Sequence, residues 1–153
     1  MAIKFMLDKL EKTEISKRVR AIIGVPEQVL TDDVISSPTF IKKAEFFINN
    51  SIKEHLDVIT DDTEFYMLEI AAMYYIGHLL CVGMYARLPK QMENLSTKTI
   101  LQNINWDKLA LDLLDKAREA IDDFLEMYDI EETNIGFTFA DLSDEQDYPA
   151  DVL

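Results

Sequence analysis

The stretch of residues 61–88 constrains the fold more than any other part of the sequence. Between residues 70 and 86 its only ionisable group of note is His78. Carboxylates stand at the start of the stretch and Arg87 stands near its end, ahead of Pro89, which matches the charge preferences of the two ends of a helix. We therefore expect one helix over 61–88, about 40 Å long at roughly 1.5 Å per residue.

A membrane span has a similar length and hydropathy. However, tyrosines interrupt the apolar stretch, Glu69 lies near one end, and the segments on both sides have the pattern of amphipathic, water-facing helices. We therefore expect a central helix buried on nearly all sides, by its own bundle and by neighbouring subunits, and no membrane partner. Gly77 and Gly83 would permit another backbone to approach this helix closely.

Amphipathic helices are predicted on both sides of the central stretch. Residues 38–56 and 105–128 place apolar side chains at steps of three and four, with Ser37 and Asn105 as N-terminal caps. A shorter helix is expected from 13 or 14 to 23, and a single further turn over 31–35. The chain is thus predicted to be all-α: a compact helical bundle with a long buried central helix and an extended acidic C-terminal tail.

Breaks in this pattern divide the chain into three parts. Gly24 and Pro26 separate an N-terminal arm with a short helix, residues 1–24, from a helical bundle core, residues 25–129. After residue 130 the helical period stops, and 134–139 alternates apolar and polar residues around a turn glycine, which predicts a short extended segment. Residues 130–153 are therefore expected to form an acidic docking tail.

Charge distinguishes these parts. The formal net charge is −14, and a surface this acidic argues against binding nucleic acid or anionic lipid, which both require Lys and Arg. Residues 130–153 carry seven acids and no basic side chain, whereas the first twenty residues carry six bases and three acids, a net of +3. One cysteine cannot form an internal disulfide, and the N-terminal charges do not fit a signal peptide, so a reducing, intracellular setting is expected.

Catalytic, metal and cofactor motifs are not found in the sequence. Neither His55 nor His78 has a Glu three residues before it, as a ferritin-like di-iron site requires, and the four glycines form neither a nucleophile elbow nor a phosphate-binding loop. His78 is interpreted as a core histidine that hydrogen-bonds across helices. Cys81 is interpreted as a small buried hydrophobe. We therefore predict a non-enzyme with no catalytic residue, no cofactor and no metal.

The C-terminal tail places aromatic residues among its acids. This composition is typical of a segment that docks on a partner and becomes ordered there. A simpler interpretation is a solvated end whose two phenylalanines cover the bundle. The residues concerned are Phe137, Phe139, Tyr148 and Leu153.

The order of elements from about residue 14 to 128 resembles the head–tail connector (adaptor) proteins of tailed bacteriophages. The likeness consists of helix order, size and apolar pattern rather than a diagnostic motif. The residues that carry it are VRAIIG at 19–24, DVI at 33–35, FIxxA at 40–44, IAAxYYIGxLL at 70–80 and MYARLP at 84–89.

The resemblance implies a structural virion protein, made in the host cytoplasm and located in the neck of the virion. Such subunits form a ring, twelve-fold by resemblance, beneath the portal protein. The ring extends the DNA channel, lets DNA pass without specific binding, and holds a tail-completion or neck protein. The tail would dock on the portal through Ile135, Phe137, Phe139 and Tyr148.

An acidic channel wall would repel the DNA duplex rather than retain it. Candidate channel-facing acids lie on the charged side of the last predicted helix, although an ordinary solvated face explains them equally well. They are Asp112, Asp115, Asp122 and Glu126. An alternative function is an acidic DNA mimic or regulatory protein-binding module, which needs acids spaced along a regular surface.

Overall fold

A computed structural model describes residues 11–57, 59, 62–91, 101 and 103–141, and of residues 88–91 and 128–141 only the backbone. This part of the chain is all-α, as predicted, and contains no strand. The helices are α2 (Lys12–Ile23), α3 (Asp32–Ile35), α4 (Pro38–Ser51), α5 (Asp62–Val82), α6 (Met84–Gln91) and α8 (Trp106–Asp141).

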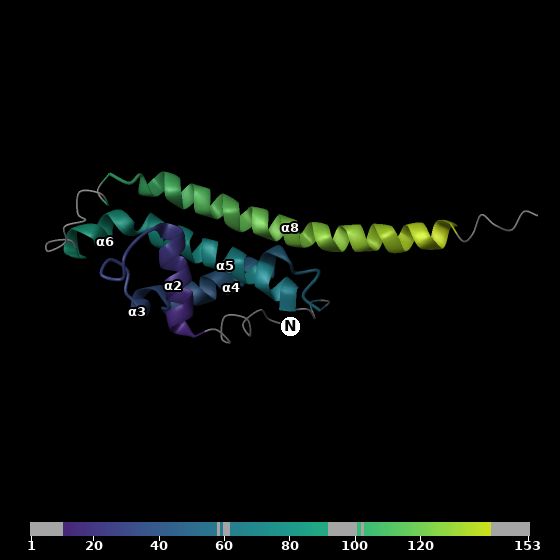
Figure 1. Cartoon of the computed structure of the whole chain (residues 1–153), viewed down its shortest axis with the longest axis horizontal. Coiled ribbons are helices and arrows are strands. Elements are labelled where there is room, and N and C mark those ends of the chain that lie inside the picture. The colour runs from purple at the N-terminus through teal and green to yellow at the C-terminus, as the bar shows by residue number, and fades with distance from the viewer. Residues whose placement is uncertain (1–10, 58, 60–61, 92–100, 102, 142–153) are drawn as a thin grey trace, which may run out of the picture.

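Helix α5 lies at the centre of the bundle, which confirms the predicted central helix. Helix α8 runs along it and forms the most extensive contact, while α4 and α2 pack on its other sides (Figure 1). The core that these helices enclose is apolar. Its largest fully buried side chains are those of Trp106, Phe124, Leu30, Ile35, Ile48, Ile52, Leu68, Met73, Ile76, Leu80 and Met84.

By length and hydropathy alone, α5 is the one helix in the described residues that could cross a membrane. It also carries a buried carboxylate, since Glu69 is 8% exposed. Arg18 of α2 places its guanidinium 3.4 Å from the Glu69 carboxylate. An ion pair to a neighbouring helix and apolar contacts to α2, α4 and α8 are the environment of a core helix in a bundle.

Capping residues begin α4 and α8 and end α2 where the sequence predicts. The Ser37 hydroxyl accepts the N–H of Thr39 at 3.4 Å, ahead of Pro38 in the first position of α4. The Asn105 side chain accepts the N–H of Lys108 at 3.0 Å at the start of α8. Helix α2 ends at Gly24, whose φ of +80° lies in the left-handed region that favours glycine.

Three helix boundaries differ from the prediction. A single helix over 61–88 is wrong, because the chain turns at Gly83 between α5 and α6, where the Gly83 N–H donates to the Leu80 carbonyl at 3.2 Å. A glycine is the weakest point of a helix interior, so the break falls there. Helix α6 then continues past Pro89, and α4 ends at Ser51 rather than at 56.

Helix α8 is longer than predicted. The extended segment expected over 134–139 is wrong, because the helix continues unbroken from Trp106 to Asp141, 36 residues or about 54 Å. Gly136 costs a helix interior about 1 kcal/mol, which is too little to stop propagation from a helix that is already formed. The last part of α8 projects beyond the bundle with no other described element beside it (Figure 1). Residues 142–153 lie outside the described part of the chain.

Gly77 accommodates side chains rather than another backbone, contrary to the prediction. A Cβ at Gly77 would lie 3.2 Å from Cδ1 of Leu113, 3.6 Å from Cγ1 of Ile23 and 3.8 Å from Cγ2 of Ile22. Leu113 comes from α8 and the two isoleucines from α2. The glycine therefore lets three helices meet in the core, while Gly83 marks the turn after α5.

Arg20 joins α2 to α3. Its guanidinium donates to the Leu30 carbonyl at 3.0 Å and to the Asp32 carboxylate at 2.6 Å, and its side chain is only 13% exposed. The Ser36 hydroxyl donates to the Asp32 carbonyl at 2.7 Å. These bonds give partners to the Leu30 carbonyl, the Asp32 carboxylate and the Asp32 carbonyl at the start of α3. A helix of only four residues has too few internal hydrogen bonds to satisfy such groups.

Candidate functional site

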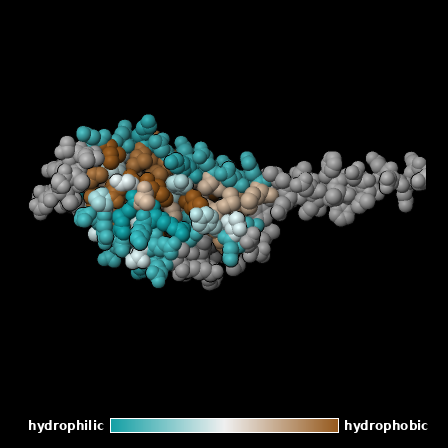
Figure 2. All heavy atoms as spheres, in the orientation of Figure 1, coloured by the Kyte–Doolittle hydropathy of each residue, from teal (hydrophilic) through white to brown (hydrophobic). Residues whose placement is uncertain are grey.

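The outward surface of α8 carries the candidate site. Positions at steps of three and four bury one side of the helix against α5, and the opposite side faces solvent. Figure 2 shows the consequence: hydrophilic residues cover the outer side of α8, and apolar residues gather along the seam below its first half. The buried positions are Trp106, Ala110, Leu113, Ala117, Ile121 and Phe124.

All four acids nominated from the sequence are exposed on this outer side. With Glu119, also exposed, they follow one another at steps of three and four, which places them along one line of the helix. We call this set the acidic stripe; its ends are fourteen residues apart, or about 21 Å. It comprises Asp112, Asp115, Glu119, Asp122 and Glu126.

Glu119 is the member of the stripe that the sequence interpretation missed. Its position three residues before Asp122 and four after Asp115 is the signal that identifies it. Between Asp115 and Arg118 the carboxylate and guanidinium lie 3.6 Å apart, with both side chains more than 60% exposed. An ion pair so exposed is screened by water and weak, so it leaves the stripe strongly negative. Residues 106–127 hold seven acids and three bases, a net charge of −4.

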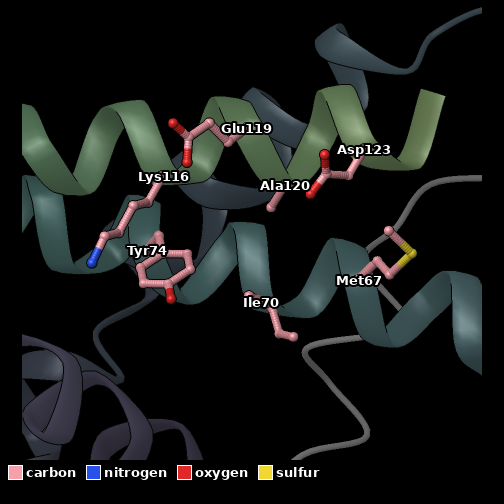
Figure 3. Close-up of a pocket in the computed structure, with 7 residues that line it drawn as sticks. All are labelled: Met67, Ile70, Tyr74, Lys116, Glu119, Ala120 and Asp123. Carbon is pink, nitrogen blue, oxygen red and sulfur yellow. The ribbon is translucent and has the colours of Figure 1, made fainter. Parts of the chain in front are cut away.

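A groove lies beside the acidic stripe, between α5 and α8 (Figure 3). Its volume is about 330 Å³. We call it the α5–α8 groove. Helix α5 supplies Met67, Ile70 and Tyr74, and α8 supplies Lys116, Glu119, Ala120 and Asp123.

The lining of the α5–α8 groove is amphipathic. Met67, Ile70 and Ala120 offer apolar surface, whereas the carboxylates of Glu119 and Asp123 come from successive turns of α8. The ammonium of Lys116 lies 5.7 Å from the centre of the Tyr74 ring, within the range of a cation–π contact. The groove thus offers an apolar floor with a mostly acidic rim.

His78 and Cys81 make contacts within the bundle. His78 of α5 donates its Nδ1–H to the Ala110 carbonyl of α8 at 2.7 Å, which confirms the predicted hydrogen bond across helices. Cys81 is fully buried, which confirms its prediction as a small buried hydrophobe, and burial raises the pKa of its thiol to about 12. A thiol in that state is not an activated nucleophile.

Metal-ligating side chains do not cluster in the described ranges: no three His, Cys, Asp or Glu residues there could hold one ion. The acids of the stripe point outward along one helix and do not converge on a common point. That the chain needs no metal and no cofactor stays a prediction.

The predicted docking residues are placed by the backbone alone. Ile135, Phe137 and Phe139 lie in the projecting end of α8, where positions 135 and 139 share one side of the helix and 137 lies nearly opposite. The alternation that suggested an extended segment therefore does not bring the three positions to one face. Tyr148 lies outside the described residues.

Comparisons with protein-family models, with curated proteins and with solved structures find no match to this chain.

Proposed function

We propose that this chain is a structural subunit of a bacteriophage neck: a head–tail connector that assembles as a ring beneath the portal protein and extends the DNA channel. The observation that carries the proposal is the acidic stripe, a line of five carboxylates on the outer side of a helix that projects beyond its own bundle. The all-α fold and the resemblance in helix order support the same function.

The stripe has the properties that a channel wall needs. DNA is held by surfaces that neutralise its phosphates with Lys and Arg, and each such contact must be broken before the DNA moves on. Carboxylates repel the phosphates instead, over a screening length of about 8 Å at physiological ionic strength. A ring repeats the stripe once per subunit, so the duplex would meet a negative wall from every side.

The projecting end of α8 supports the second half of the proposal, attachment to the portal. A single helix without a packing partner is marginal in water, because most helical stability in proteins comes from burying an apolar face. In the described residues no other element lies beside this end (Figure 1). A partner protein would supply the missing contact, and Ile135, Phe137 and Phe139 lie in this segment. We propose the portal as that partner, with a tail-completion protein on the other side of the ring.

The regular spacing of the stripe also favours the alternative function, an acidic DNA mimic. Carboxylates on successive turns of α8 lie about 5 Å apart, so the stripe is a regular row of negative charges, as a mimic requires. A mimic would act as a single chain on a DNA-binding protein, whereas a connector acts as a ring on a portal. The two functions therefore differ in the mass of the complex that each forms.

Native mass measurement of the purified chain mixed with purified portal protein tests the proposal. A connector gives a stoichiometric complex in which one ring binds another. A chain that stays monomeric beside the portal and displaces DNA from a DNA-binding protein is a mimic, and that result would overturn the proposal.

Two variants separate the roles of the stripe and of the C-terminal part. Removal of residues 131–153 should abolish portal binding, and full binding by the shortened chain would remove the docking role. Replacement of Asp112, Asp115, Glu119, Asp122 and Glu126 by their amides should leave portal binding intact, because these residues are remote in sequence from the docking segment. The same variant should retain DNA more strongly than the parent in a filter-binding assay at low salt.

A further inference from the structure

The α5–α8 groove can accept an apolar side chain that is accompanied by positive charge. Its floor consists of Met67, Ile70 and Ala120, and its volume of about 330 Å³ is large enough for an aromatic ring. The carboxylates of Glu119 and Asp123 stand on the α8 side of this floor (Figure 3). Both are exposed, and among the described residues neither forms an ion pair. A basic group that approaches them therefore displaces no partner.

The outer side of α4 carries the complementary combination. Phe46 is 68% exposed, more than any other large apolar side chain in the described residues. Ala44 and Ile48, two positions before and after it, are fully buried, so Phe46 points away from the bundle. Lys42 and Lys43 lie one turn before it and are exposed. We call Lys42, Lys43 and Phe46 the α4 surface.

The charge on the α4 surface is opposite to the charge at the groove. The exposed residues of α4 include both lysines and no acid, and its one acid, Glu45, is half-buried. Among the described residues neither lysine forms an ion pair. Lys116, the one base among the described lining residues of the groove, lies against the Tyr74 ring and leaves the two carboxylates in excess. Complementary charge of this kind selects a partner and fixes its orientation.

One chain cannot bring its own α4 surface to its own groove. Tyr74 of α5 lines the groove, whereas the next residue, Tyr75, stacks on Phe47 of α4 with 4.1 Å between the ring centres. Successive residues of a helix point about 100° apart, so the groove and α4 lie on different sides of α5. On α4, Phe47 faces α5 and Phe46 faces solvent. The two surfaces are therefore available to two different neighbours.

We propose that the α4 surface of one copy of this chain docks in the α5–α8 groove of a second copy. The Phe46 ring covers the apolar floor of the groove, and the two lysines pair with Glu119 and Asp123. Each copy presents the α4 surface on one side of α5 and the groove on another, so the contact is head-to-tail. Repetition of a head-to-tail contact gives a closed ring or an open chain of subunits.

This contact is the one by which subunits of the proposed ring would join, and to that extent it rests on the proposed function. It requires neither the portal nor DNA, so it can be tested on the chain alone. Glu119 belongs to both the acidic stripe and the groove, while the other four members of the stripe are outside the groove lining. Docking therefore leaves most of the stripe uncovered for the channel.

Carbodiimide cross-linking of the unaltered chain tests the contact. The reagent joins an amine to a carboxylate that touches it. In an equal mixture of unlabelled and nitrogen-15-labelled chains, a link between two copies is recognised because its peptides carry both labels. We expect mixed-label links from Lys42 or Lys43 to Glu119 or Asp123, about tenfold more abundant than links from the same lysines to Asp112 on the outer side of α8. Mixed-label links without this preference, or none between these positions, would overturn the proposal.

Phe46→Ala adds a readout that misfolding would not produce. When only the labelled chain carries this change, links from the variant's lysines to the parent's carboxylates should fall about tenfold, because the ring that fills the groove is missing. Links from the parent's lysines to the variant's carboxylates should persist, since the variant's own groove is intact. Tyr85→Ala, which removes another exposed aromatic side chain, is the matched control and should leave both directions equal. Loss of both directions, or of neither, in Phe46→Ala would refute head-to-tail docking.

Native mass measurement with the portal separates failure of this contact from failure of the neck function. A chain that forms the predicted links but does not bind the portal keeps the head-to-tail contact and loses the proposed function. A chain that forms a ring on the portal without these links keeps the proposed function and loses the contact.

Discussion

Leu113 and Leu111 form a matched pair for measuring how strongly α8 is held to α5. They are the same residue type on the same helix, two positions apart. Leu113 is 2% exposed, whereas Leu111 is 61% exposed. Replacement by alanine removes the same carbons from a buried position in one variant and from an exposed position in the other. The difference in their free energies of unfolding therefore isolates the contribution of burial.

The magnitude follows from the contacts of Leu113. Its removal by Leu113→Ala takes three buried carbons from the core, worth about 2.4 kcal/mol at about 0.8 kcal/mol each. The cavity that remains adds roughly 1–2 kcal/mol, because one of its walls is Gly77, which has no side chain with which to fill it. We expect a loss of about 4 kcal/mol for Leu113→Ala, and less than about 0.5 kcal/mol for Leu111→Ala.

Urea unfolding followed by far-ultraviolet circular dichroism measures both values from the midpoint and slope of the transition. If Leu113→Ala costs no more than Leu111→Ala, α8 does not pack on α5 as described here.

Gly77 provides an internal check on the same contact. In the parent chain, Gly77→Ala gains about 1 kcal/mol of helix propensity but places a Cβ 3.2 Å from Cδ1 of Leu113, so the two effects oppose each other. In the Leu113→Ala background that crowding is absent and the new methyl fills part of the cavity. The double-mutant cycle should therefore show a favourable coupling of about 1 kcal/mol. Strict additivity would contradict the predicted contact.

Three further predictions concern other parts of the bundle. Asn105→Ala removes the side chain that accepts a backbone N–H in the first turn of α8 and should cost about 1 kcal/mol in the same urea assay. An unchanged midpoint would show that the cap is dispensable. Arg20→Ala breaks the bonds from α2 to the Leu30 carbonyl and the Asp32 carboxylate and should cost about 2 kcal/mol. Its control, Arg118→Ala, breaks only the exposed pair with Asp115 and should cost less than about 0.5 kcal/mol. Equal losses would argue against the α2–α3 junction. Burial raises the pKa of the Cys81 thiol from 9.0 to about 12, so above pH 9 the unfolded chain releases a proton that the folded chain keeps. Stability should therefore fall from pH 9 to 12 more steeply than in Cys81→Ala, by at most about 1.4 kcal/mol per pH unit, and parallel pH profiles of the two proteins would refute this.

Local chemistry made most helix ends predictable from the sequence. Ser37 and Asn105 act as caps because their side chains accept backbone N–H groups, and Gly24 ends α2 because it adopts a positive φ. These signals depend on neighbours within four residues, so no knowledge of the fold is needed. The central position of α5 was predictable for a similar reason, since so apolar a helix must be covered.

The errors arose where tertiary contacts or helix propagation outweigh a local signal. The alternation over 134–139 favours an extended strand, yet α8 continues through Gly136, because lengthening a formed helix is easier than ending it. Gly77 contacts side chains of α2 and α8 rather than another backbone, and which of the two it contacts depends on the helices that lie nearby. The α5–α8 groove was unpredictable for the same reason, because its lining comes from two helices more than forty residues apart in sequence.

The most direct test of the proposed function is an electron cryo-microscopy reconstruction of the complex between this chain and the portal protein. The connector account predicts a ring coaxial with the portal, with Asp112, Asp115, Glu119, Asp122 and Glu126 of every subunit facing the lumen and the C-terminal end of α8 against the portal. A reconstruction without a ring, or a ring whose acidic stripe faces outward, would contradict it.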